Sequence, residues 1–171
     1  MRRFLPVVAF LVLIASSVQL RAQTRVVKPT SSKIEDGLFL GGFVETPPEG
    51  VKAVLNVCEA KNNYKADFSR FAPIRNSAPA PSLDWLRDQV AFVDDHRRAD
   101  RPVYVHCAVG MSRSGMVVVA YLMQRDGPSR DDALKTVQRQ REMVKPNPAF
   151  LDLLAAWETD LKKRKPVPKS K

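Results

Sequence analysis

Short apolar runs alternate with longer amphipathic segments along this chain. Residues 51–58 and 102–106 are short and rich in β-branched side chains, which is typical of buried strands. Residues 38–42 predict a short edge strand that ends at two glycines, and residues 71–74 predict a weaker strand before a proline-marked loop. Strands that come first and then alternate with helices indicate an α/β fold with a small central mixed sheet flanked by helices.

Four segments carry helical signals. Residues 82–99 begin with a serine cap and place leucine and valine at helical spacing. Residues 114–124 are apolar on every side, as in a helix buried at the centre of a domain. Residues 129–143 open with a Ser-x-x-Asp pattern that resembles a capping box, and an Asn-Pro pair at 147–148 opens the last helix. The apolar face of that last helix consists of Phe150, Leu151, Leu154, Trp157 and Leu161.

The two ends of the chain differ in composition from the part between them. Residues 1–22 combine a basic start, an apolar run and a cleavage site after Ala22, which predicts a signal peptide or, if it is not cleaved, a signal anchor. Residues 23–33 then form a polar leader, residues 34–161 the folded domain, and residues 162–171 a basic, disordered tail. We therefore expect the folded part outside the cytoplasm, either periplasmic or secreted, or held at the membrane by the uncleaved signal.

The net charge of +10 belongs to these ends. Residues 1–22 carry three arginines and no acid, residues 162–171 carry six basic side chains, and the part between them is close to neutral. The basic tail also lacks interleaved aromatic residues, so we expect no nucleic-acid binding. The tail is most simply a solvated end, with contact to an anionic membrane surface as the alternative. Two cysteines and two histidines exclude a disulfide framework and a zinc ribbon.

The segment 106–115, HCAVGMSRSG, lies between a predicted strand and the buried helix. Successive backbone N–H groups that wrap into a helix N-terminus form an anion-binding nest, and Gly110 allows the tight turn. The planar guanidinium of Arg113 matches two phosphate oxygens at once. We expect phosphate to be bound by Arg113 and by the backbone of Ala108, Val109, Gly110, Met111 and Ser112.

Cys107 lies at the base of this positive cup, where its thiolate is favoured. A thiolate beneath a bound phosphate is a nucleophile aimed at phosphorus, and it would form a phosphocysteine that water later hydrolyses. Ser114 can donate to the sulfur and assist its departure, whereas His106 is interpreted as a residue that orients the loop. The alternative is a buried cysteine with an unrelated arginine nearby, which the strand–loop–helix context disfavours.

With these residues in place, the chain resembles the dual-specificity branch of the cysteine-based protein tyrosine phosphatases over most of residues 33–160. Residues 34–41, 54–59 and 141–157 are similar to the family's opening strand, second strand and closing segment. The compact loop after Cys58 resembles the phosphatases of regenerating liver and the phosphatase-and-tensin type. The resemblance implies a phosphatase-like fold, a phosphorylated protein or a small phosphate ester as substrate, and neither metal nor cofactor.

Asn76 departs from the family pattern. Similar enzymes carry a general-acid Asp at this position, three residues after a proline that corresponds to Pro73. An amide cannot deliver a proton, and general-acid catalysis is typically worth about 10²–10⁴-fold. Asp67 and Asp84 are the nearest substitutes by sequence, although each is better explained as structural. We therefore expect activated aryl phosphates to react far better than alkyl phosphates.

Cys58 is the second position of interest. Some similar phosphatases carry a cysteine at the end of this strand that forms a reversible disulfide with the nucleophile, which makes Cys58 a candidate redox partner of Cys107. The alternative is a small buried hydrophobic residue.

Two functions remain open at this stage. The first is a cysteine-dependent phosphomonoesterase, either a protein tyrosine or a dual-specificity phosphatase. The second is a catalytically impaired module that binds a phosphorylated partner. Neutral side chains at the variable loop positions argue against highly anionic inositol phosphates, and the resemblance along the chain argues against arsenate reduction or sulfur transfer.

Overall fold

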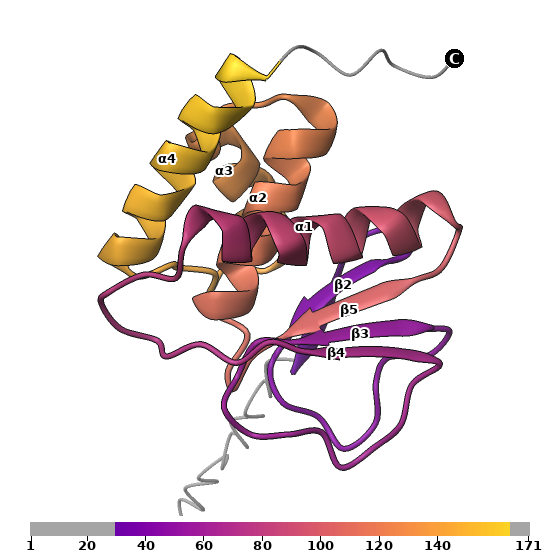
Figure 1. Ribbon diagram of the computed structural model, residues 1–171. Helices are drawn as coiled ribbons and strands as arrows, with labels where there is room; N and C mark the ends of the chain where they lie inside the picture. Colours follow the sequence, from indigo (N-terminus) through magenta and orange to yellow (C-terminus); the bar gives the residue numbers. More distant parts are fainter. Residues whose placement is uncertain (1–29, 165–171) are drawn as a thin grey trace, which may run out of the picture.

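The computed structural model describes residues 30–164, in which four helices and a five-stranded sheet form one layered unit (Figure 1). The strands are β1 (Ser31–Glu35), β2 (Leu38–Gly41), β3 (Ala53–Asn56), β4 (Phe68–Phe71) and β5 (Val103–His106). The helices are α1 (Leu83–Arg98), α2 (Arg113–Asp126), α3 (Arg130–Gln140) and α4 (Pro148–Lys163). The sheet order is β1-β2-β5-β3-β4, with β1 antiparallel to β2 and all other pairs parallel, so the predicted mixed α/β fold is confirmed.

The helices gather on one side of the sheet, with α2 at their centre (Figure 1). α2 packs against α1, α3 and α4, and its first eleven residues are buried on every side, as its sequence predicts. The indole Nε1 of Trp157 on α4 donates to the Ala120 carbonyl of α2 at 3.0 Å. Asn147 caps α4 by accepting from the Phe150 amide at 3.0 Å, again as predicted. These contacts fix the helix that begins at the candidate site.

The opposite face of the central strand is covered by loops. Val103 and Val105 of β5 pack into the main core, and the alternate residues Tyr104 and His106 are fully buried on the other side. Phe43, which follows β2, packs its ring edge-on against the ring of His106, with 6.0 Å between the ring centroids. β5 is thus enclosed on both faces, and its carboxyl end is held in a rigid environment.

The hydrophobic pattern did not predict the first strand. The family resemblance placed one opening strand over residues 34–41, where the structure has the end of β1 and the whole of β2. Residues 38–42 were expected to form an edge strand, but β2 is internal, because Ser31 and Ser32 of the supposed leader pair with Gly41 and Leu40. The leader prediction is therefore wrong from residue 31 onward. An edge strand with one covered face needs few apolar residues, and in β1 only Ile34 is buried, so the hydrophobic pattern did not reveal it.

Three other boundaries differ from the predictions. A strand was expected over residues 71–74, but β4 lies earlier and occupies Phe68–Phe71. It is at the sheet edge, and all four of its residues are exposed. α3 ends at Gln140 rather than 143, because Arg141 leaves the helical backbone at φ −145° and ψ 84°. A disordered tail was predicted over residues 162–171, but its first two residues are the last two of α4. There Lys162 forms an ion pair with Glu158 at 2.7 Å.

The remaining terminal predictions lie outside the described residues. These are the signal segment 1–22, the leader up to residue 29 and the tail from residue 165. Within residues 30–164, none of the helices combines the length and the hydropathy that crossing a membrane requires.

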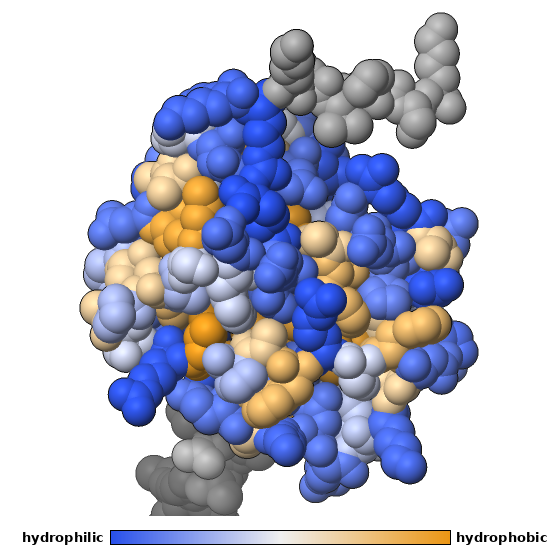
Figure 2. Space-filling model, viewed as in Figure 1, coloured by the Kyte–Doolittle hydropathy of each residue, from blue (hydrophilic) through white to orange (hydrophobic). Residues whose placement is uncertain are grey.

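Figure 2 shows a mostly hydrophilic surface interrupted by small apolar patches. Among the described residues, the large hydrophobic side chains with the greatest exposure are Phe68, Phe71, Val109 and Met111. The first two lie on the edge strand β4, and the last two lie on the loop that follows β5.

Candidate active site

The loop of residues 107–112, here called the Cys107 loop, joins the central strand β5 to the N-terminus of α2. Its tight turn depends on Gly110, which has a φ of +75°. A Cβ atom at this position would lie 2.3 Å from the carbonyl carbon of Gly41. The end of β2 and the residues that follow it support the loop. The Phe43 amide donates to the Ala108 carbonyl at 3.0 Å, and the Gly41 carbonyl accepts from the Cys107 amide at 3.2 Å.

The sulfur of Cys107 lies at the bottom of this loop and is almost completely buried. It accepts hydrogen bonds from the Gly110 amide and the Ser114 hydroxyl, each at 3.3 Å. Burial alone would raise the pKa of this thiol, but the hydroxyl and amide of Ser114 and the amides of Gly110 and Val109 outweigh burial and bring the pKa below its ordinary value. The loop therefore favours the thiolate.

The guanidinium of Arg113 is held from one side. Its Nη1 donates to the carboxylate of Glu59 and to the Ile74 carbonyl, the latter at 3.0 Å. The hydrogen bond from Arg113 lowers the pKa of Glu59, so this carboxylate is charged. Within residues 30–164 no partner reaches Nε or Nη2 of Arg113. That edge is left for an anion, in the geometry that suits two phosphate oxygens.

His106 is buried beside the nucleophile and makes contacts at both ring nitrogens. Nε2 lies 3.0 Å from Oδ1 of Asn62 and 3.4 Å from the Tyr64 hydroxyl, and Nδ1 lies 3.3 Å from the Cys107 carbonyl. Its ring stacks on Tyr104 with a centroid separation of 5.2 Å. Burial lowers the pKa of His106 to about 4, so the imidazole is neutral at pH 7. These contacts fix the chain at Cys107.

Above the sulfur there is a small pocket of about 90 Å³. Its lining comprises Asn76, Cys107, Val109, Met111, Ser112 and Arg113. Asn76 arrives from the loop after β4, and its Oδ1 accepts from the side chain of Asn147 at 3.3 Å. Of the predicted phosphate-binding residues, Ala108 and Gly110 do not line the pocket, and the Ala108 carbonyl accepts from the Phe43 amide. The structure thus brings Asn76 to the nucleophile.

The two substitute acids lie elsewhere. Asp67 precedes β4, at the edge of the parallel strands opposite to Cys107, and it forms an ion pair with Lys52 at 3.4 Å. Asp84 lies in the first turn of α1 and pairs with Arg87. Among the described residues that line the pocket, none is a carboxylic acid.

The two cysteines are free thiols. Cys58 is buried at the end of β3 and donates from Sγ to the Ala60 carbonyl at 3.3 Å. Burial raises the pKa of the Cys58 thiol, and both cysteines belong to the same hydrophobic core. Cys107 is therefore the more readily ionised of the two thiols.

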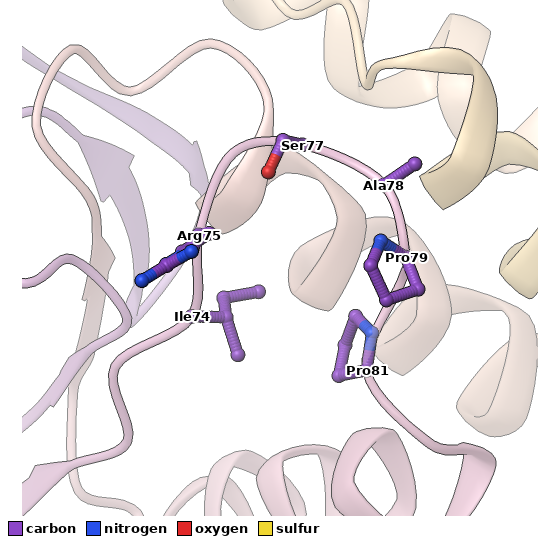
Figure 3. Close-up of a pocket in the computed structure, with 6 residues that line it drawn as sticks. All are labelled: Ile74, Arg75, Ser77, Ala78, Pro79 and Pro81. Atoms are coloured by element: carbon purple, nitrogen blue, oxygen red, sulfur yellow. The ribbon is translucent and has the colours of Figure 1, made fainter.

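A second cavity, of about 240 Å³, lies under the arch of residues 74–81 (Figure 3). Ile74, Pro79 and Pro81 lie beneath the arch, whereas Arg75 extends to its outer side (Figure 3). The same loop carries Asn76 into the smaller pocket. The lining of this second cavity is mainly apolar, with Arg75 and Ser77 as its polar members.

Sequence reasoning missed several residues of the site. Glu59 holds Arg113, Asn62 and Tyr64 contact His106, and Arg141 donates to two carbonyls of the Cys107 loop. All four lie far in sequence from the loop, so neither its motif nor the hydrophobic pattern points to them. Only Glu59 carried a signal, because it directly follows the predicted strand 51–58, and the carboxyl end of the corresponding β3 lies next to that of β5.

Residues 44–160 match the family model described as dual specificity phosphatase, catalytic domain. Human dual specificity protein phosphatase 8 is 38% identical over 119 residues, which cover 66% of this chain and 19% of that protein. Dual specificity protein phosphatase 1-A of Xenopus laevis is 29% identical over 114 residues, covering 66% of this chain and 31% of the relative. This chain therefore matches less than a third of the length of either relative.

Solved structures give the same result. Human DUSP28 superposes with a TM-score of 0.73 at 27% identity, over 80% of this chain and 97% of that one. A mouse putative dual specificity phosphatase, complexed with zinc tungstate, has a TM-score of 0.73 at 25% identity, over 83% of this chain and 94% of that one. The chain belongs to the dual-specificity phosphatase catalytic-domain family, a branch of the cysteine-based protein tyrosine phosphatases.

Proposed function

We propose that this chain hydrolyses phosphomonoesters, with phosphotyrosine and other aryl phosphates as its best substrates. The observation that carries the proposal is the environment of the Cys107 sulfur, which accepts two hydrogen bonds at 3.3 Å beneath a pocket that also exposes one edge of Arg113. This arrangement stabilises a thiolate and places a phosphate-binding fork beside it. Membership of the phosphatase family supports the same reaction.

In the first step, the phosphoryl oxygens bind to the amides of the Cys107 loop and to the free edge of Arg113. The thiolate then attacks phosphorus, so that an S–P bond forms as the bond to the ester oxygen breaks. With an amide at position 76, no side chain of the pocket supplies a proton to that oxygen. A phenolate, being a good leaving group, departs without this help more easily than an alkoxide.

In the second step, water attacks phosphorus and the S–P bond breaks. The sulfur leaves as a thiolate, the water proton passes to solvent, and inorganic phosphate is released. Ser114 assists this step, because its hydroxyl lies 3.3 Å from the sulfur and stabilises the developing negative charge.

The rim of the pocket supports an aromatic leaving group. Val109 is 57% exposed and Met111 is 38% exposed, and both line the pocket. Such side chains contact an aromatic ring favourably and offer no charge to the additional phosphates of an inositol lipid. The proposed partners are therefore phosphorylated proteins or small aryl phosphate esters.

We further infer an extracytoplasmic location, either periplasmic or secreted, from the pattern of residues 1–22. N-terminal sequencing of the mature protein tests this inference. A first residue at Gln23 supports cleavage, an intact Met1 in the membrane fraction supports the anchor, and an intact protein in the cytoplasm contradicts both.

Hydrolysis of p-nitrophenyl phosphate tests the proposed function. The purified protein is assayed with fresh reductant beside a Cys107→Ser variant, and we expect turnover that is lost in the variant. The mass of the alkylated, non-reduced protein shows in parallel whether Cys58 and Cys107 have formed a disulfide. Tight phosphate binding without turnover in the reduced protein would contradict the proposal and favour a phosphate-binding module.

A further inference from the structure

The Cys107 loop has an outer side as well as an inner one. Peptide groups that point their N–H toward the pocket point their carbonyl oxygens into the protein, where a buried carbonyl without a donor costs about 1–3 kcal/mol. Arg141 supplies these donors. Its Nε donates to the Gly110 carbonyl at 2.8 Å and its Nη2 donates to the Val109 carbonyl at 3.1 Å.

Arg141 is fixed in this position by its surroundings. It is only 5% exposed, and its Nη1 donates to the Ser32 hydroxyl of β1 at 3.2 Å. Its backbone amide donates to the Val137 carbonyl at 2.9 Å and its carbonyl accepts from the Val144 amide at 3.0 Å. The guanidinium therefore joins the Cys107 loop to the first strand of the sheet.

The rest of the segment 141–147 contacts the same loop. The Lys145 amide donates to the Met111 carbonyl at 2.9 Å, and the Asn147 amide donates to the Ser112 hydroxyl at 3.0 Å. Together with Arg141, this segment meets four consecutive residues of the loop from behind. Only Arg141 does so through a side chain, so it is the contact that a substitution removes cleanly.

We propose that Arg141 is a positioning residue of the phosphatase reaction. By binding the Val109 and Gly110 carbonyls from behind, it holds the N–H groups of the same two peptide units, those of Gly110 and Met111, toward the thiolate and the phosphate. The inference rests on the proposed function, because it assigns Arg141 to the same pocket. The charge of Arg141 adds to the effect, since Cys107 and Arg141 interact favourably as thiolate and guanidinium. A lysine cannot replace the planar fork that serves two carbonyls at once.

The test compares Arg141→Met and Arg141→Lys with a matched control, Arg139→Met. Arg139 is exposed on α3 and donates to Thr136 at 2.8 Å, away from the loop. Four properties are measured for each protein. These are kcat and KM on p-nitrophenyl phosphate, the pH dependence of iodoacetamide alkylation at Cys107, the affinity for inorganic phosphate, and the midpoint of urea unfolding.

We expect kcat/KM of Arg141→Met to fall on the order of 10–100-fold, the range seen when a residue that orients a metal ligand is removed. Phosphate affinity should fall as well, and the alkylation profile should move to higher pH because the thiolate loses its oriented amides. Arg141→Lys should be intermediate and Arg139→Met unchanged. A merely structural role would lower the unfolding midpoint without moving the pH profile of the folded protein.

Three outcomes decide the inference. A folded Arg141→Met protein with unchanged kinetics, phosphate affinity and pH profile overturns it. If Arg141→Met does not fold, the pH profile of Arg141→Lys decides instead, and an unmoved profile overturns the inference. If the unsubstituted protein shows no turnover, the proposed function fails, and phosphate affinity alone then tests Arg141, with full affinity in both variants counting against it.

Discussion

Ser114 offers one proton to two acceptors, the Cys107 sulfur and the Gly41 carbonyl, each 3.3 Å away. When the sulfur becomes a leaving group, its negative charge draws that proton toward it. In Ser114→Ala we expect kcat to fall about 10–100-fold, since a hydrogen bond to a charged group is worth about 1.5–3 kcal/mol. Rapid-mixing assays should show a burst of nitrophenolate followed by slow turnover. An unchanged kcat without a burst would contradict this role.

The two cysteines should differ in reactivity with pH. The pKa of Cys107 is lowered and that of Cys58 is raised, so Cys107 forms a thiolate at a lower pH than Cys58 does. The alkylation rate at Cys107 should rise with pH only up to its lowered pKa and stay flat above it, whereas an ordinary thiol becomes more reactive up to about pH 8.5. Peptide mass spectrometry after brief iodoacetamide treatment measures both sites. Preferential labelling of Cys58 would contradict the assignment.

Restoring a carboxylic acid at position 76 tests the origin of the substrate preference. Asn76→Asp places an acid in the pocket beside the nucleophile. We expect kcat/KM on a phosphoserine peptide to rise about 10²-fold or more, because an alkoxide needs a proton to leave. The rate on p-nitrophenyl phosphate should change little and serves as the internal control. Equal gains on both substrates would show that Asn76 limits something other than leaving-group protonation.

At the scale of elements, two glycines provide a matched comparison. Gly110 and Gly127 have φ values of +75° and +76°, but a Cβ at Gly127 meets nothing within 4 Å, whereas one at Gly110 overlaps the backbone of Gly41 and Gly42. Gly127→Ala should cost about 1 kcal/mol of unfolding free energy, from backbone strain alone. Gly110→Ala should cost about 1–3 kcal/mol more, from overpacking, and should lose activity. Urea unfolding measures both, and equal losses would contradict the role of the Gly41 contact.

The elements with local signals could be predicted from the sequence. Ser82, Ser129 and Asn147 each cap the helix that follows them, and their capping contacts are present. The Cys107 loop is contiguous in sequence, so its nucleophile, its glycine and its arginine could be proposed together. The family resemblance, and not the loop motif, pointed to Asn76 as the position that usually holds the general acid, and Asn76 does line the pocket.

The remaining parts of the site depend on contacts between distant segments. Glu59 and Arg141 are ordinary charged residues in sequence, and their roles arise only when β3 and the segment after α3 come together around the loop. The hydrophobic pattern did not reveal β1, because this edge strand has few apolar residues and is recognised only by its pairing with β2. Sequence patterns therefore reveal interactions between residues close in the chain, but not these contacts between distant segments.

At the scale of the whole molecule, buried imidazoles make stability depend on pH. The pKa of His106 is about 4 in the folded state, below its ordinary value of about 6.5, because burial disfavours the cation, and burial also lowers the pKa of His96. The unfolded chain therefore binds more protons below pH 6.5, and stability falls as the pH falls. His106 alone should cost on the order of 2 kcal/mol between pH 7 and pH 5.

Urea unfolding at pH 7, 6 and 5 measures this loss. His106→Asn removes the titrating group, so its unfolding free energy should vary less over this range than that of the unsubstituted protein. Most carboxylates remain ionised above pH 5 and contribute little there. A stability that is constant between pH 7 and pH 5 would contradict the buried neutral state of His106.

The sheet order has a consequence for how activity arises during folding. β5, which leads to the nucleophile, pairs with β2 on one side and β3 on the other, and neither strand is its neighbour in sequence. Contacts of this kind form late, since the intervening chain must first be ordered. Hydrolysis of a fluorogenic aryl phosphate during refolding should therefore begin only when β2, β3 and β5 have paired, and its onset would report the time at which the sheet is complete. Two fragments divided at the α1–β5 turn should each be inert and regain turnover only when they recombine.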